Sequence, residues 1–101
     1  MAISLRFIYK HSPTCSLSAL AAEQVERFQS QHPDCPVQWL DVFEQRGECQ
    51  RIERDTGVRH ESPQALLFAG DQVVWHASHR RVTAEAMASA LDQHAATMPN
   101  P

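Results

Sequence analysis

The feature that most constrains the fold is a change of hydrophobic period along the chain. Residues 3–9 read Ile-Ser-Leu-Arg-Phe-Ile-Tyr, a short run rich in β-forming residues that is typical of a strand. From Ser16 onward the apolar side chains recur every three or four residues, as on one face of an amphipathic helix. The segment His32-Pro33-Asp34 ends this helix, because proline cannot continue the hydrogen-bond ladder. A strand followed by a helix after a short turn over residues 10–15 favours an α/β fold.

Five further elements continue the alternation. They are a strand over residues 37–42, a weaker helix over 45–56, strands over 65–69 and 72–77, and a final helix that begins after Thr83. Gly57 suits the left-handed end of the weaker helix. The pair Gly70-Asp71 fits a tight hairpin turn, which makes the last two strands antiparallel. The order βαβαββα predicts a four-stranded mixed sheet with helices on both faces, as in a minimal thioredoxin or glutaredoxin fold.

The final helix carries its own start signals. Thr83 is a suitable N-cap, and Val82 and Met87 have the spacing of a hydrophobic staple. The residues expected on its apolar face are Ala84, Met87, Ala88, Leu91 and Ala95. We therefore expect a single domain over residues 1–97 and a flexible tail over 98–101.

Charge and apolar run lengths exclude several classes of function. Nine basic residues stand against twelve acidic ones, and the only lysine is Lys10, so the basic footprint of a nucleic-acid-binding protein is missing. The arginine pairs Arg51/Arg54 and Arg80/Arg81 are interpreted as solvated faces. The longest apolar run, residues 65–69, is far too short to cross a membrane, and no signal peptide is expected at the N-terminus.

The cysteines direct attention to single-thiol chemistry. Cys15, Cys35 and Cys49 are odd in number, which argues against a disulfide framework and for a reducing cytoplasm. No pair has the C-x-x-C spacing of a zinc ribbon or a dithiol redox site. His11, His60 and His79 could gather near Cys15, but their spacing is not that of a metal site. We expect neither a metal nor a permanently bound cofactor.

Cys15 has the position of a reactive thiol. It stands where the first helix begins, so unpaired N–H groups and the positive end of the helix dipole favour its thiolate. Lys10 and His11 could add positive charge beside it. Hydroxyl groups that could donate hydrogen bonds to the sulfur belong to Ser12, Thr14, Ser16 and Ser18. Alternatively, Cys15 only fills space in a polar loop.

The segment Cys15-Ser16-Leu17-Ser18 has a serine where a dithiol oxidoreductase has its second cysteine. Serine forms no disulfide, so any exchange must finish with a thiol from elsewhere. Cys35 precedes the second strand, roughly 20 Å away along the first helix, which argues against a resolving role. Cys49 is expected to be a buried apolar residue of the second helix, with a role as a backup thiol left open.

The dipeptide Ser62-Pro63 precedes the third strand directly. In thioredoxin-like proteins a cis-proline stands there, faces the reactive cysteine, and leaves neighbouring backbone groups free to pair with an extended substrate. An X-Pro bond is usually trans, so the sequence leaves the isomer open, and an ordinary proline at a strand start is the alternative.

Four short blocks resemble the YtxJ family of bacillithiol-system redox proteins, also called monothiol bacilliredoxins. The blocks are Lys10-His11-Ser12, Thr14-Cys15-Ser16-Leu17-Ser18, His60-Glu61-Ser62-Pro63-Gln64, and Trp75 with Ser78-His79. The likeness covers nearly the whole chain, and Ser-Pro-Gln after His-Glu is its most distinctive part. The family usually has Thr-Cys-Pro-Ile-Ser around the cysteine, so Ser16 and Leu17 depart from it.

The resemblance implies a mechanism in which Cys15 attacks a mixed disulfide between a protein and bacillithiol. The protein leaves as a thiol, bacillithiol remains on Cys15, and free bacillithiol regenerates the enzyme. The implied substrate-binding residues are His60, Ser62, Pro63, Gln64, Ser78, His79 and Thr83. Ser62 and Pro63 would position the disulfide, while Ser78, His79 and Thr83 would lie near a carboxylate of the small thiol.

The expected partners are therefore S-thiolated proteins and a small thiol, with bacillithiol or another low-molecular-weight thiol as co-substrate. Neither nucleic acid nor a membrane is expected as a partner, and the chain is expected to be a cytoplasmic monomer or weak dimer. Two other functions remain open. One is a non-catalytic thioredoxin-fold module that binds a protein or peptide, and the other is a monothiol glutaredoxin-like iron–sulfur carrier.

Overall fold

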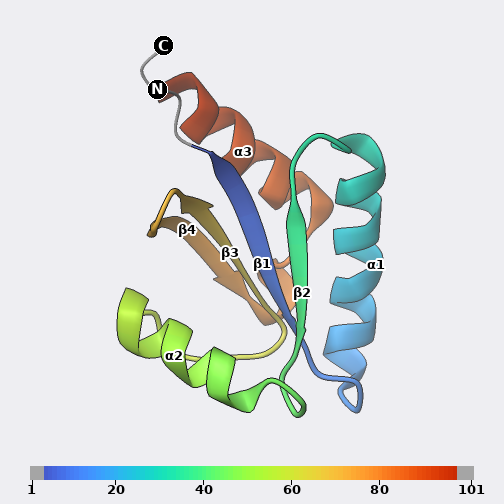
Figure 1. Cartoon of the computed structure of the whole chain (residues 1–101). Helices are drawn as coiled ribbons and strands as arrows, with labels where there is room; N and C mark the ends of the chain where they lie inside the picture. The colour runs from blue at the N-terminus through green and yellow to red at the C-terminus, as the bar shows by residue number, and fades with distance from the viewer. Residues whose placement is uncertain (1–3, 98–101) are drawn as a thin grey trace.

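The computed structural model describes residues 4–97 of the chain (Figure 1). Its elements are β1 (Leu5–His11), α1 (Ser16–Gln31), β2 (Val37–Asp41), α2 (Arg46–Thr56), β3 (Gln64–Ala69), β4 (Gln72–Ser78), the short 3-10 helix η1 (His79–Arg81) and α3 (Ala84–Thr97). The predicted order βαβαββα is confirmed. The predicted tail over residues 98–101 and the start of the first strand at Ile3 lie outside the described residues.

The four strands form one mixed sheet in the order β2-β1-β3-β4. β1 runs parallel to β2, whereas β3 is antiparallel to both β1 and β4. The tight turn between β3 and β4 contains Gly70 at φ +61°, a left-handed conformation that glycine adopts without a steric penalty. At one end of the sheet Lys10 pairs with Gln64, and Gln64 pairs with Ser78. The end of β1, the start of β3 and the end of β4 therefore meet at the same edge.

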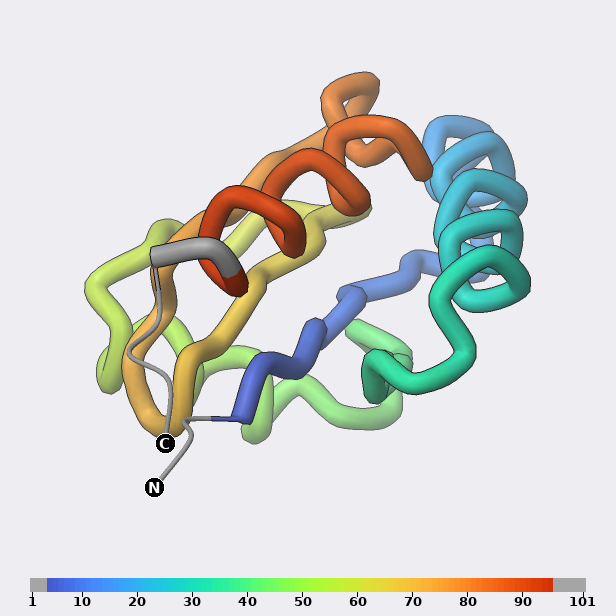
Figure 2. Tube along the Cα trace, turned by 90° about the horizontal axis from the view of Figure 1, so that it is seen from above, coloured from blue at the N-terminus to red at the C-terminus, as the bar shows by residue number. Residues whose placement is uncertain are grey.

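Helices cover both faces of the sheet, as predicted. α1 and α3 lie together on one face and α2 lies alone on the other (Figure 2). Alternation along β1 builds both cores, because Phe7 and Tyr9 pack toward α1 and α3 while Ile8 packs toward α2. The larger core also contains Phe28 of α1 and Met87 of α3.

Local start and stop signals operate as the sequence predicts. The Thr83 hydroxyl accepts a hydrogen bond from the backbone N–H of Ala86 at 3.0 Å, so Thr83 caps α3. Val82 and Met87 are both buried in the same cluster. Gly57 ends α2 at φ +75°. No helix within residues 4–97 is long and apolar enough to cross a membrane.

Several predicted boundaries and faces need correction. β1 continues to His11, so Lys10 belongs to the strand and not to the turn, because β2 and β3 both extend far enough to pair with it. β2 ends at Asp41, α2 begins at Arg46 and β4 reaches Ser78, each one residue from the predicted limit. On α3, the predicted apolar face is confirmed for Ala84, Met87, Ala88 and Leu91, which lie in or against the larger core. Ala90 belongs to the same face, whereas the predicted Ala95 is exposed.

Candidate active site

Cys15 occupies the N-cap position of α1. Its backbone is extended, at φ −103° and ψ 127°, and its carbonyl accepts hydrogen bonds from the N–H groups of Ser18 and Ala19 at 3.1 and 3.2 Å. The side chain is half-buried and makes no capping hydrogen bond. The thiol therefore stands at the positive end of a sixteen-residue helix, where a negative charge is stabilised.

Hydrogen bonds beneath Cys15 fix the turn that carries it. The N–H of Cys15 donates to the carbonyl of Ser12 at 3.3 Å, and the N–H of Ser12 donates to the Ser18 hydroxyl at 3.2 Å. The Tyr9 hydroxyl donates to the Ser18 carbonyl at 3.2 Å. Ser18 thus holds the turn, at the position where a dithiol enzyme would have its second sulfur.

Burial raises the pKa of the Tyr9 phenol to about 12, against a smaller opposing effect of its hydrogen bond to Ser18. Negative charge on Cys15 also raises it. The phenol therefore stays protonated, and remains a donor, at every pH at which thiol exchange takes place. On its other side, the hydroxyl lies 3.3 Å from Nδ1 of His11, whose ring contacts Trp39.

The hydroxyl donors predicted for the sulfur divide into two pairs. Ser12 and Ser18 are buried and bonded to each other, while Thr14 and Ser16 are exposed. Their predicted effect on the thiol stays a prediction.

Lys10 is not placed as predicted. Strand alternation directs its side chain to the α2 face, away from Tyr9 and α1, where it is fully buried. Its ammonium donates to Nδ1 of His60 at 3.1 Å, and the charges that act on it belong to Cys49 and Glu53 of α2. Lys10 is therefore a partner of the loop before β3 and not of Cys15.

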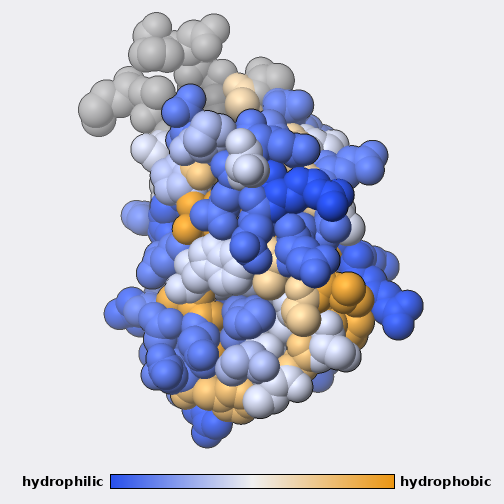
Figure 3. Space-filling model, turned by 90° about the vertical axis from the view of Figure 1, so that its right-hand side faces the viewer, coloured by the Kyte–Doolittle hydropathy of each residue, from blue (hydrophilic) through white to orange (hydrophobic). Residues whose placement is uncertain are grey.

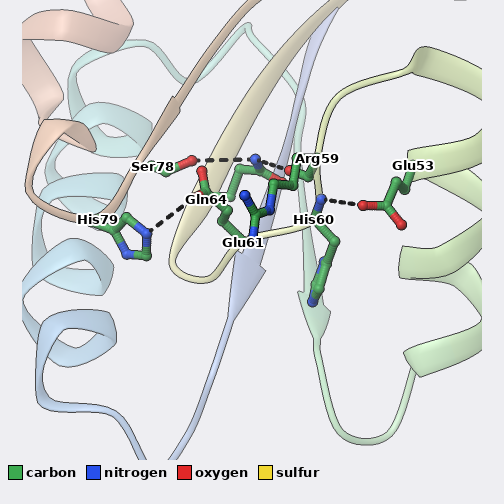
Figure 4. Close-up of polar contacts among 7 residues, drawn as sticks. All are labelled: Glu53, Arg59, His60, Glu61, Gln64, Ser78 and His79. Carbon is green, nitrogen blue, oxygen red and sulfur yellow. Dashed lines mark hydrogen bonds and ion pairs between the residues drawn. The ribbon is translucent and has the colours of Figure 1, made fainter.

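The Ser62–Pro63 peptide bond, whose isomer the sequence left open, is cis. Pro63 is fully buried, and its carbonyl accepts a hydrogen bond from the N–H of His79 at 2.8 Å. Figure 4 shows the side chains that hold the loop on either side of it. The amide nitrogen of Gln64 donates to the carbonyl of Arg59 at 2.9 Å and to the Ser78 hydroxyl at 3.2 Å.

A cleft of about 520 Å³ opens between the first turn of α1 and the β4–η1 corner. Leu17 lines it on one side, and Glu61, Ser78, His79, Arg80 and Arg81 line it on the other. Leu17 is two residues from Cys15, so the cleft opens at the helix turn that begins at Cys15. Arg80 and Arg81 are exposed, as expected for a solvated face, and they also belong to the cleft wall.

Charge in this cleft is mixed. Glu61 has a lowered pKa, because its carboxylate accepts hydrogen bonds from Ser78 and His79, and the His79 ring nitrogen lies 3.4 Å from it. His79 itself has a left-handed backbone at φ +57°, an uncommon conformation outside glycine that turns the chain sharply after β4.

Thr83 does not reach this cleft wall. Its hydroxyl is used to cap α3, and the residue lines a smaller neighbouring pocket with Leu20 and Arg80.

The other thiols are held away from Cys15. Cys49 is 2% exposed in the core beneath α2, as predicted, on the opposite face of the sheet from Tyr9 and α1. Cys35 lies beyond the far end of α1 and is half-buried. Within residues 4–97, no three His, Cys, Asp or Glu side chains come together as metal ligands would.

Comparisons with known proteins show the family and the fold of the chain. The model of the family described as monothiol bacilliredoxin BrxC matches residues 3–87, which is most of the chain. The chain belongs to this bacilliredoxin family. The resemblance noted in the sequence is thus confirmed, and membership supports a thiol redox function.

Solved structures confirm the fold. A protein suggested to be an oxidoreductase with a thioredoxin fold is 34% identical, with a TM-score of 0.82 over 87% of this chain and 78% of that one. Thioredoxin-2 of the malaria parasite is 10% identical, with a TM-score of 0.77 over 93% and 86%. Fasciola hepatica thioredoxin is 13% identical, with a TM-score of 0.72 over 90% and 81%. The last two show the thioredoxin fold alone.

Proposed function

We propose that this bacilliredoxin removes bacillithiol, or a similar small thiol, from protein mixed disulfides through Cys15. The observation that carries the proposal is the half-exposed thiol of Cys15 at the start of α1, at the sheet edge that also holds the cis Ser62–Pro63 bond and the arginine-lined cleft. A reducing cytoplasm, which keeps such a thiol free, suits this chemistry.

The exchange reaction needs only one thiol of the enzyme, that of Cys15. The Cys15 thiolate attacks the small-thiol sulfur of the mixed disulfide, the S–S bond breaks, and the protein sulfur leaves as a thiolate that takes up a proton. A free small thiol then attacks the adduct on Cys15, which releases a small-molecule disulfide and restores the thiolate. No second enzyme sulfur enters, which agrees with Ser18 in the turn and with Cys35 and Cys49 held elsewhere.

The cleft beside Leu17 supports an anionic small thiol as the co-substrate. Arg80, Arg81 and His79 can pair with carboxylates, and the ionised Glu61 can pair with an amine. A small thiol that carries both carboxylate and amine groups, as bacillithiol does, fits such a wall. Ser62 and the cis-proline are proposed to hold the disulfide, and Ser78 to act in the same wall.

The protein part of the substrate needs a surface beside the thiol. In Figure 3, which views the side formed by α1, apolar residues gather toward the lower end of the molecule while hydrophilic residues cover the upper part. Leu20, one turn beyond Leu17, is 62% exposed. We propose that S-thiolated proteins dock over this end of α1.

The test uses a protein carrying one bacillithiol mixed disulfide, incubated with the reduced enzyme and followed by intact mass. Wild type is expected to remove the adduct and to carry it briefly on Cys15. Cys15→Ala should remove none, whereas Cys35→Ala and Cys49→Ala, the matched controls, should act like wild type. Equal removal by Cys15→Ala would reject the function.

A further inference from the structure

The loop that carries Pro63 is tied to β1 through one buried side chain. Lys10 is 0% exposed, and its ammonium donates to Nδ1 of His60 at 3.1 Å. Lysine is rarely buried so completely unless a partner compensates for the lost hydration of its charge. Since β1 leads from Lys10 into the Cys15 turn within five residues, this bond joins the thiol-bearing turn to the loop before β3.

His60 is held from a second direction by α2. Its backbone N–H donates to the Glu53 carboxylate at 2.8 Å, as Figure 4 shows. Pro63 follows three residues later and is fixed on its far side by the hydrogen bond from His79. The loop is therefore clamped by β1 and α2 before the cis-proline and by the β4–η1 corner after it.

We propose that Lys10 and His60 are positioning residues, whose hydrogen bond holds the Pro63 loop opposite Cys15 in the geometry that mixed-disulfide exchange needs. The inference rests on the proposed function. Neither residue is proposed to touch the reacting sulfur. They act by placing Pro63.

The bond requires a neutral His60. A lysine ammonium has only donors, so Nδ1 can accept from it only while that nitrogen carries no proton. A proton on Nδ1 would make that nitrogen a donor that faces the Lys10 ammonium, another donor. It would also bring two positive charges close together. The groups that face the pair are Cys49 and Glu53 from α2 and Glu61 from the loop itself.

The electrostatics favour that neutral state near pH 7. Burial and the Lys10 charge lower the pKa of His60, and together they outweigh the opposite effect of Glu53 and Glu61. Burial also lowers the pKa of Lys10. The outer part of the His60 residue lines a cleft of about 260 Å³ with Phe43 and Arg46, so protons reach the ring from solvent. Acid is therefore expected to release the loop.

The experiment compares two reactions of Cys15 in the same variants. Exchange with a protein mixed disulfide needs the Pro63 loop in place, whereas alkylation by iodoacetamide needs only the thiol. Lys10→Met and His60→Ala are expected to slow exchange by roughly tenfold to a hundredfold while alkylation changes by less than about twofold. Arg54→Met, an exposed cation of α2, is the matched control and should leave both rates unchanged.

The variant His60→Asn tests whether the hydrogen bond to Lys10 matters, rather than the histidine ring itself. Its amide oxygen replaces Nδ1 as an acceptor but cannot titrate, so this variant should recover most of the exchange rate. Because acid slows every reaction of a thiolate, the readout is the ratio of the exchange rate to the alkylation rate, which should fall in acid for wild type and stay constant for His60→Asn. Recovery of exchange, with a ratio of exchange to alkylation that does not fall in acid, supports the proposal. Equal losses of exchange and alkylation, or a wild-type rate in Lys10→Met and His60→Ala, would overturn it.

The two proposals fail separately. If wild type itself removes no adduct, the proposed function is wrong. If wild type is active and His60→Ala equals it, only the positioning role is wrong. Should Lys10→Met fail to fold, His60→Ala and His60→Asn still decide the question, because His60 is exposed on its outer side and no core residue is removed.

Discussion

The hydroxyl of Tyr9 donates a hydrogen bond to the carbonyl of Ser18, which ties the end of β1 to the first turn of α1 across 3.2 Å. Its neighbour Lys10 extends to the other face of the sheet and bonds His60. Two successive residues of one strand thus support two parts of the candidate site, the thiol-bearing turn on one face and the Pro63 loop from the other.

The first prediction concerns the titration of Tyr9. It is the only tyrosine of the chain, so the ultraviolet absorbance of tyrosinate reports it alone. The folded protein should titrate near pH 12 and the protein unfolded in denaturant near pH 10, because burial disfavours the phenolate. A single midpoint near pH 10 in both states would contradict the buried phenol.

The same shift makes stability depend on pH. Because the pKa of Tyr9 is higher in the folded state, its contribution is fully present below about pH 10 and is lost as pH rises through about 12. Tyr9→Phe should lack this alkaline loss, and at neutral pH should be less stable by about 1 kcal/mol for the lost hydrogen bond. Urea unfolding of both proteins across the alkaline range measures the difference.

A second prediction concerns the order in which the three thiols react. Burial raises the pKa values of Cys35 and Cys49, and only Cys15 stands at a helix start. Iodoacetamide at neutral pH should label Cys15 first, Cys35 next and the buried Cys49 last, as peptide mass mapping can show. Raising the pH should speed the labelling of Cys35 and Cys49. Faster labelling of Cys35 than of Cys15 would remove the reason to make Cys15 the nucleophile.

A third prediction tests the cleft wall. Replacing Arg80 and Arg81 by serine should raise the KM for an anionic small thiol by roughly tenfold, which is about 1.4 kcal/mol of lost binding. The first step, adduct removal from the protein, should also slow, because the small-thiol group that Cys15 takes up carries the same carboxylates. Steady-state and single-turnover rates separate the two steps. Arg54→Ser is the control, and an unchanged KM in the double variant would exclude the arginines from binding.

The order of elements followed from the sequence because each signal was local. Each signal acts within a few residues of the chain: the changes of hydrophobic period, Pro33, Gly57, the Gly70 turn and the Thr83 cap. The continuation of β1 beyond Tyr9 depends instead on residues that are distant in the sequence. Lys10 and His11 look like turn residues alone, and only pairing with β2 and β3 keeps them in the strand.

The site was predictable in part for the same reason. The predicted start of the first helix indicated Cys15, and the Ser-Pro dipeptide before a strand indicated Pro63. The isomer of the Ser62–Pro63 bond, however, depends on tertiary context. The side of the sheet taken by Lys10 depends on the strand limit, so its partner His60, fifty residues away, could not be inferred. The position of Arg80 and Arg81 in the cleft wall was not predicted, because it depends on the sharp turn at His79. That turn has no glycine from which the sequence could indicate it.

The last prediction concerns α2, which packs alone on its face of the sheet and buries few side chains. Of its eleven residues, all of them described, only Cys49 and Ile52 are buried, and a cavity of about 410 Å³ lies beside Ile52 and Phe68. Hydrogen exchange should therefore show α2 opening at a lower free energy than β1 and β3, which are covered on both faces. Ile52→Ala should lower that opening energy further, by about 2 kcal/mol, at the low end for such truncations because the site already adjoins empty space. Val25→Ala in the larger core is the control and should lower global stability without selectively exposing α2. Protection of α2 amides equal to that of β3 would show that the helix opens only when the whole chain unfolds.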